Sequence, residues 1–359
     1  MQPAGTQKGG NSVGVKLAVP LAAFALVLTG VNLPAQEHNR EALAQANLGL
    51  NLSHQEKYRE AIAAYKRAIA LDPAIPGLYL NLGLAYFKIG DFREAIPAFD
   101  KERAKSPGPK VETLLAMSHF GLGEYRQAAQ LLKPLAASQP DNAELTYLLA
   151  KCYLWSNQYD DAMNLFKDLL SRDPNSVAVH MLMGEALDAQ RRTADAITEF
   201  EAAAKAAPTQ PDVHFGLGYL YWEQRRYEDA EREFREELKN NPKNGQAAAY
   251  LGDVLMKAGK KEEALACLKT ATQLRPDIHV ARVDLGVLYA ENKNYEAAIA
   301  EFRKAVELEP ASFDAHYRLA RLYRELGRTA EANAEFAVVQ KLHEKKTEEP
   351  LMKVSGSSR

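Results

Sequence analysis

Hydrophobic and polar residues follow a pattern that repeats at a nearly constant interval from residue 42 to about residue 344. In each period an alanine is followed four residues later by a bulky apolar residue. The alanines are Ala61, Ala95, Ala128, Ala162, Ala196, Ala230, Ala264, Ala298 and Ala332. Their bulky partners are Tyr65, Phe99, Leu132, Phe166, Phe200, Phe234, Leu268, Phe302 and Phe336. Residues four apart share one face of an α-helix, so the pattern predicts an amphipathic helix in every period.

Prolines mark the ends of the first eight periods, at positions 73, 107, 140, 174, 208, 242, 276 and 310. The intervals between successive prolines are equal, except that the one from 107 to 140 is shorter by a single residue. Proline cannot continue a helix, although it suits the start of the next segment. Earlier in each period a Leu-Gly-like pair precedes a ring or a leucine by three residues, as in Leu82-Gly83 and Tyr86. A second helix per period follows, and the small residue lets the two helices approach closely.

These positions resemble the tetratricopeptide repeat, whose signature is W-x₂-L-G-x₂-Y, then A-x₃-F, then P over about 34 residues. The resemblance implies an all-α fold, a right-handed α-α superhelical solenoid of about nine tetratricopeptide helix hairpins that bury their apolar faces by stacking. We expect this solenoid over residues 36–344. Its repeats are expected at about 42–75, 76–108, 109–142, 143–176, 177–210, 211–244, 245–278, 279–312 and 313–344. Pro97 and Pro134 fall inside second helices and predict a local bend in each.

The first 35 residues predict a signal peptide or an N-terminal membrane anchor. A glycine-rich, positively charged start leads into the apolar stretch Leu17 to Val31, which is shorter than the roughly 20 residues of a membrane-spanning helix. Cleavage after Ala35 suits a small residue, whereas Leu33 does not fit an A-x-A site, so attachment to a membrane through residues 17–33 stays open. Either form predicts an exported, periplasmic or extracytoplasmic protein. The charged, Ser-rich tail, residues 345–359, is expected to be disordered.

Composition and charge narrow the function. The net charge of −2 favours no nucleic-acid partner. Cys152 and Cys267 are too widely spaced for a disulfide framework. His180, His214 and His316 occupy equivalent repeat positions, too far apart to share one metal ion. No phosphate loop, nucleophile elbow or zinc-hydrolase motif occurs, so we expect no catalysis, metal or cofactor.

The resemblance implies that the first helix of each unit lines a concave surface that binds peptides. Carried over position by position, the candidate groove residues are Asn47, Asn81, Phe87, Met117, Phe120, Leu154, Trp155, Tyr219, Trp222, Tyr250, Met256, Arg318, Arg321 and Arg324. This set predicts a polar beginning, an aromatic and aliphatic middle from Phe87 to Met256, and a basic end. Alternatively, single rings pack against the neighbouring unit, and the arginines pair with Glu325, Glu331 or Glu335.

The leading hypothesis is a non-enzymatic scaffold that binds other proteins or peptides in this groove, as part of an envelope or secretion assembly. The alternative is a regulatory or substrate-presenting subunit of an enzyme, for example a glycosyltransferase or a peptidase, whose catalytic part is another chain. The partner, the pathway and the oligomeric state are open at this stage.

Overall fold

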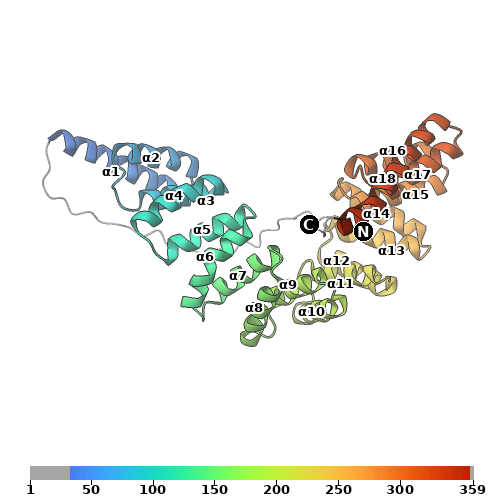
Figure 1. Ribbon diagram of the computed structural model, residues 1–359, viewed down its shortest axis with the longest axis horizontal. Coiled ribbons are helices and arrows are strands. Elements are labelled where there is room, and N and C mark those ends of the chain that lie inside the picture. Colours follow the sequence, from blue (N-terminus) through green and yellow to red (C-terminus); the bar gives the residue numbers. More distant parts are fainter. Residues whose placement is uncertain (1–32, 356–359) are drawn as a thin grey trace. The chain divides into compact units, whose positions relative to one another are not determined.

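The structure is a computed structural model that describes residues 33–355, with the side chains of residues 39–344. This part of the chain is a succession of α-helices joined by short turns, without strands (Figure 1). The helices are α1 (Leu33–His54), α2 (Tyr58–Leu71), α3 (Leu78–Lys88), α4 (Phe92–Lys105), α5 (Pro109–Gly121), α6 (Tyr125–Ser138), α7 (Ala143–Trp155), α8 (Tyr159–Arg172), α9 (Val177–Ala189), α10 (Thr193–Ala206), α11 (Val213–Glu223), α12 (Tyr227–Asn240), α13 (Gly245–Lys257), α14 (Lys261–Leu274), α15 (His279–Glu291), α16 (Tyr295–Leu308), α17 (Phe313–Glu325) and α18 (Thr329–Ser355). The predicted all-α solenoid of helix hairpins is confirmed.

The chain divides into two compact units, residues 1–98 and 99–359, whose boundary falls inside α4. In the first unit α1 packs against α2, and α2 against α3. In the second unit each odd-numbered helix from α5 to α17 pairs with the helix that follows it. Each even-numbered helix from α6 to α16 then contacts the first helix of the next pair. The core is therefore a chain of nearest-neighbour contacts, as in other stacked repeats.

The periodic alanines and their bulky partners form this core. All nine alanines are at most 2% exposed, and eight of the nine partners are buried, while Phe336 in the last hairpin is half-buried. The alanine brings the second helix close to its neighbours, and the bulky residue four positions later fills the space on the same helix face. The sequence-based prediction for these positions is confirmed.

The small residue of the Leu-Gly-like pair allows the two helices of one hairpin to touch. A Cβ atom built on Gly218 would lie 2.8 Å from the ring of Phe234, and one on Gly286 would lie 2.5 Å from the ring of Phe302. Real Cβ atoms do not come this close to ring carbons, so glycine at these positions sets the helix separation.

Every turn inside a hairpin contains one residue in the left-handed backbone region. These residues have φ between 59° and 78° and are Glu56, Gly90, Gly123, Asn157, Arg191, Arg225, Gly259, Lys293 and Gly327. A left-handed residue after the last helical turn ends a helix and reverses the chain direction. Glycine suits this conformation because it has no Cβ atom, yet four of the nine positions hold a long charged side chain.

In each of four first helices, one side chain contacts both a glutamate of the second helix and the carbonyl oxygen of the proline before the hairpin; we call this pair of contacts the polar tie. His214 Nδ1 lies 2.8 Å from Glu233 Oε2 on the second helix of its hairpin, and Nε2 lies 2.9 Å from the carbonyl oxygen of Pro208, which ends the preceding repeat. His180 and His316 repeat this arrangement, and so does the guanidinium of Arg282. The position that the repeat signature gives to tryptophan is therefore used here for hydrogen bonding. Within the described residues, no three His, Cys, Asp or Glu side chains converge on a possible metal ion.

Several predictions about the ends of the chain and the interior prolines have different outcomes. Residues 1–32 lie outside the described part, so the signal or anchor remains a prediction, and none of the described helices is long and apolar enough to cross a membrane. The tail, residues 345–359, was expected to be disordered; α18 continues as helix through its described part to Ser355. α4 and α6 run through Pro97 and Pro134 without interruption, and the expected bends stay predictions.

Candidate functional site

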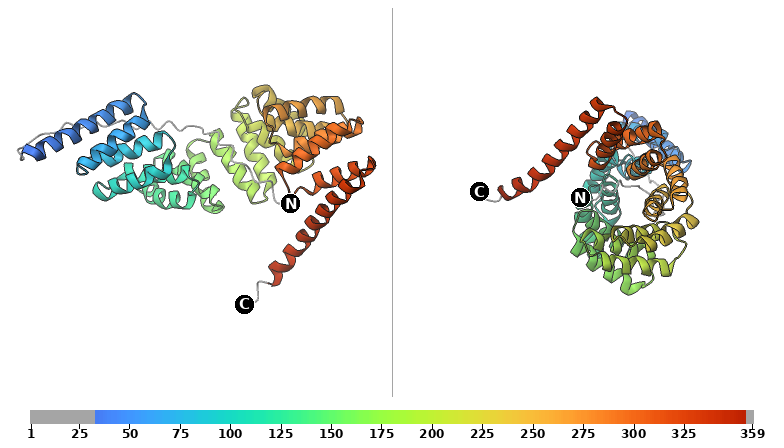
Figure 2. Two further views of the ribbon diagram at one scale, coloured as in Figure 1. Left: turned by 90° about the horizontal axis from the view of Figure 1, so that it is seen from above. Right: turned by 90° about the vertical axis from the view of Figure 1, so that its right-hand side faces the viewer.

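The odd-numbered helices of the second unit form an inner layer. α7 contacts α9, α11 contacts α13, α13 contacts α15, and α15 contacts α17, in addition to their contacts with the even-numbered helices. Figure 2 shows the helices from α9 to α17 following a curved path. Helices on the inside of a curved stack lie closer together than those on the outside, so the odd-numbered helices line the concave side of this unit. We call the side chains they present there the inner surface.

A cluster of four half-buried rings lies on the inner surface of α11 and α13. It consists of Phe215, Tyr219, Trp222 and Tyr250, and we call it the Trp222 cluster. The ring centroids of Trp222 and Tyr250 are 5.0 Å apart in an edge-to-face arrangement, and those of Tyr219 and Tyr250 are 5.4 Å apart. Such pairs add about 0.5–1.5 kcal/mol beyond the area that they bury. The cluster joins two repeats and still exposes part of each ring.

Four carboxylates, Asp188, Glu223, Asp253 and Asp284, belong to consecutive helices of the inner layer, and we call them the acidic strip. Trp222 Nε1 donates a hydrogen bond to Asp253 Oδ2 at 2.5 Å, and the Lys257 ammonium bonds the other oxygen of Asp253. Tyr219 donates its hydroxyl hydrogen to Glu223 at 3.2 Å. Two members of the acidic strip, Glu223 and Asp253, are therefore hydrogen-bonded to the Trp222 cluster.

Electrostatic coupling shows that the strip and the cluster share one environment. Burial, followed by repulsion from Asp253 and Glu223, raises the pKa of the Tyr250 hydroxyl to about 12. Burial also raises the pKa of the Asp188 carboxyl, with repulsion from Glu223 acting in the same direction and Arg191 opposing it. The structure brings aromatic rings and these carboxylates together, whereas the aromatic and aliphatic middle of the groove stays a prediction.

Asp284 on α15 differs from the other members of the strip. Its side chain is buried, with 8% of its surface exposed, and its Oδ2 atom has no hydrogen-bond partner. Burial, then repulsion from Asp253, raises the pKa of this carboxyl to about 7, against the opposing effect of Lys257 and Arg318. An unsatisfied buried carboxylate oxygen destabilises a fold, so its presence requires an explanation.

A second aromatic cluster lies near the start of the inner layer of this unit. Trp155 is 38% exposed, and its ring centroid is 5.2 Å from those of both Phe120 and Tyr125. The ammonium of Lys151 lies 4.8 Å from the Trp155 centroid and 5.2 Å from that of Phe120, within range of a cation–π interaction. Burial lowers the pKa of Lys151. We call these residues the Trp155 cluster.

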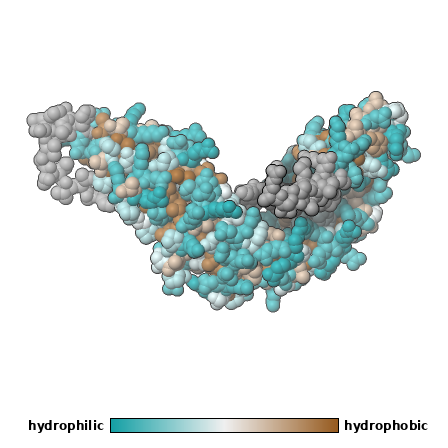
Figure 3. All heavy atoms as spheres, viewed as in Figure 1, coloured by the Kyte–Doolittle hydropathy of each residue, from teal (hydrophilic) through white to brown (hydrophobic). Residues whose placement is uncertain are grey.

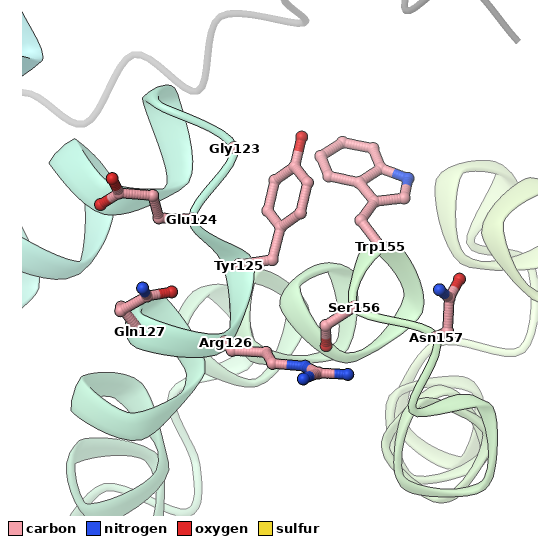
Figure 4. A pocket seen from close by; sticks show the side chains of 8 residues that line it. All are labelled: Gly123, Glu124, Tyr125, Arg126, Gln127, Trp155, Ser156 and Asn157. Atoms are coloured by element: carbon pink, nitrogen blue, oxygen red, sulfur yellow. The ribbon is translucent and has the colours of Figure 1, made fainter. Parts of the chain in front are cut away.

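A shallow pocket of about 280 Å³ adjoins this cluster. The turns between α5 and α6 and between α7 and α8 form it, and in Figure 4 the Tyr125 and Trp155 side chains project side by side at its edge. Glu124, Arg126 and Asn157 supply polar groups to its lining.

On the face of the molecule shown in Figure 3, hydrophobic residues form small groups among hydrophilic ones.

The other predicted groove residues are placed as follows. In the first unit Asn47 is exposed on α1, Asn81 is half-buried on α3, and Phe87 packs edge-on against Phe92 at 5.2 Å. Met117 and Met256 are half-buried on α5 and α13. The inclusion of Leu154 was wrong, because only 5% of this side chain is exposed and it belongs to the core. The same repeat position faces the core in α7 and the inner surface in α11.

The predicted arginine stripe on α17 has partners other than those considered. Arg318 donates to Asp314 at 2.8 Å, one helical turn earlier. The guanidinium of Arg321 lies 6.0 Å from the ring of Tyr317, and that of Arg324 lies 5.4 Å from the ring of Phe336. Arg321 and Arg324 are exposed, and the basic end of the groove stays a prediction.

Sequence reasoning missed three contributors, Tyr125, Phe215 and Asp253. Tyr125 begins a second helix, and Phe215 lies beside the signature's tryptophan position, so neither belongs to the positions that the resemblance transfers. The contact of Trp222 with Asp253 spans 31 residues between adjacent repeats. Comparing each first-helix position with its neighbours one repeat later would have suggested it.

Comparison with protein families identifies the repeats independently. Two models described as "Tetratricopeptide repeat" and one described as "TPR repeat" match this chain. The first matches residues 119–186, 189–236 and 289–348, the second residues 215–277 and 251–312, and the third residues 52–90. Together these matches cover well over half of the chain.

The chain belongs to the tetratricopeptide repeat family. No curated protein sequence matches this tetratricopeptide repeat protein. Among solved structures it is similar to YrrB, described as "a TPR protein with an unusual peptide-binding site", with 20% identity and a TM-score of 0.42 over 49% of this chain and 91% of that one. It is also similar to MamA from Desulfovibrio magneticus RS-1, with 21% identity and a TM-score of 0.42 over 47% of this chain and 96% of that one. Similarity at this level supports no conclusion about the function of this chain.

Proposed function

We propose that this tetratricopeptide repeat protein is a non-enzymatic scaffold that binds a polypeptide segment on the inner surface of its second unit. The observation that carries the proposal is the Trp222 cluster, in which four rings of two neighbouring repeats meet on the concave side while each keeps part of its surface exposed. Tryptophan and tyrosine are the residues most enriched at energetically dominant positions of protein interfaces.

The Trp155 cluster supports the same function at a second point of the inner layer. Trp155 leaves 38% of its surface exposed although two rings and the Lys151 ammonium surround it. Two aromatic anchors on different repeats suit an extended or helical segment better than a small molecule, because a small-molecule site encloses most of its ligand.

The test is to replace both tryptophans. We expect a Trp155→Ala, Trp222→Ala double variant to remain folded by circular dichroism and to lose at least about 2 kcal/mol of binding free energy for a segment that the wild type binds, as for interface hot spots. The segment is taken from a random peptide library selected on the wild-type protein, and the affinity is measured by isothermal titration calorimetry.

Tyr295→Ala is the matched control. Tyr295 is a half-buried ring at the start of α16, in the outer layer. Its removal should leave the affinity unchanged. Undiminished binding by the double tryptophan variant would refute the assignment of the inner surface, and equal loss in the control variant would point to a general loss of stability.

We also propose that the protein acts in an extracytoplasmic compartment, within an envelope or secretion assembly. The basis is the apolar stretch within residues 17–33 behind a positively charged start. Expression of the full chain, followed by separation of periplasm, membrane and cytosol, tests this. Recovery of the chain in the periplasm or in detergent-soluble membrane supports export, and recovery in untreated cytosol overturns it.

A further inference from the structure

We propose that the segment bound on the inner surface inserts a cationic side chain, lysine or arginine, against Asp284 and beside the Trp222 cluster. This inference rests on the function proposed above and specifies the chemistry of the partner. Its starting point is the Asp284 Oδ2 atom, which is buried and has no hydrogen-bond partner among the described residues.

The nearby cations already have carboxylates of their own. Lys257 bonds Asp253 within α13, and Arg318 donates to Asp314 within α17 at 2.8 Å. Both cations are close enough to Asp284 to influence its ionisation, yet neither supplies a hydrogen bond to Oδ2. Both cations near Asp284 are therefore committed to other carboxylates, and the Oδ2 atom stays without a hydrogen-bond partner.

Register places Asp284 next to the aromatic anchor. Asp284 on α15 is equivalent to Tyr250 on α13, one repeat earlier in the chain. α13 contacts α15 directly, and Asp253, which accepts from Trp222, is the carboxylate that repels Asp284 most strongly. A segment lying across the Trp222 cluster thus reaches Asp284 within one repeat.

The chemistry of the surroundings favours a cation over the other possible occupants. An anionic side chain would meet Glu223, Asp253 and Asp284 of the acidic strip. An apolar side chain would leave the Asp284 oxygen without a partner. A lysine or arginine supplies a charge-assisted hydrogen bond, and its methylene stem can lie along the half-buried rings. Flanking cationic groups also gain a cation–π interaction with Trp222 or Tyr250.

The experiment is a selection with a random peptide library displayed on phage, applied in parallel to the full-length wild type, Asp284→Asn and Trp222→Ala. Asparagine keeps the shape of the side chain and removes its charge. Asp160→Asn, at an exposed position in the first turn of α8, is the control for the loss of one negative charge. Circular dichroism confirms that each variant is folded before selection.

We expect wild type and Asp160→Asn to select peptides enriched in lysine or arginine, whereas Asp284→Asn selects peptides without that enrichment. A selected peptide should bind Asp284→Asn about tenfold or more weakly than wild type, and replacing its lysine by norleucine should cause the same loss on wild type but no further loss on Asp284→Asn. If wild type and Asp284→Asn select the same peptides, without enrichment in lysine or arginine, this inference is overturned while the proposed function stands. Selections that do not depend on Trp222 would overturn the proposed function as well.

Discussion

The polar tie of His214 gives a quantitative prediction about how the repeats are held together. His214→Ala removes two hydrogen bonds, one of 2.8 Å to Glu233 and one of 2.9 Å to the Pro208 carbonyl. A hydrogen bond to a charged group contributes about 1.5–3 kcal/mol and a neutral one about 0.5–1.5 kcal/mol. Glu233 keeps a bond from Arg232, and the Pro208 carbonyl keeps one from Asn240. We therefore expect a loss near the lower end of the sum, about 2–3 kcal/mol.

The assay is urea unfolding followed by far-UV circular dichroism, combined with amide hydrogen exchange. Because each repeat contacts only its neighbours, the destabilisation should be concentrated near the substitution. Amides of α11 and α12 should lose protection in His214→Ala, while those of α17 keep it. A uniform loss across the second unit would mean that the tie does not act locally.

Arginine at the same position provides a rescue. The guanidinium of arginine can donate to both acceptors, as that of Arg282 does to Glu301 and the Pro276 carbonyl. His214→Arg should therefore retain the stability that His214→Ala loses. His54→Ala, at an exposed position on α1, is the control. If His214→Ala shifts the unfolding midpoint no more than His54→Ala, the tie contributes nothing and the reasoning is refuted.

Three further predictions concern single positions. Gly218→Ala places a methyl group 2.8 Å from the Phe234 ring and should cost about 1–3 kcal/mol by overpacking, measured by urea unfolding; an unchanged midpoint would contradict the close helix approach. Arg225→Gly removes the backbone strain of a non-glycine residue at φ 59° and should raise the free energy of unfolding by up to about 1 kcal/mol. The urea midpoint should therefore rise, and a lower midpoint would contradict the strain. Burial raises the pKa of Asp284 from 3.8 to about 7 in the folded state, so the folded state binds this proton more tightly than the unfolded state. Its contribution is fully present below about pH 4 and is lost as the pH rises through about 7; Asp284→Asn should flatten that part of the stability profile, and a profile identical to the wild type would contradict the assigned burial.

The sequence by itself determined the architecture. Ala230 and Phe234 recur at a fixed spacing because every hairpin solves the same packing problem with residues close together in the chain, and Gly218 is specified by the ring that it touches. Each repeat contacts only its neighbours, so a local pattern is enough to specify the stack. The identity of the family followed from the same positions.

Only the tertiary structure decided which side chains are available for binding. Leu154 and Trp222 occupy the same repeat position, yet Leu154 is buried in the core and Trp222 bonds to Asp253 on the next repeat. The isolation of Asp284 Oδ2 likewise depends on where Lys257 and Arg318 place their charges. The repeat period gives the order of the hairpins, whereas the rotation between neighbouring hairpins and the size of the side chains around each position decide which groups meet.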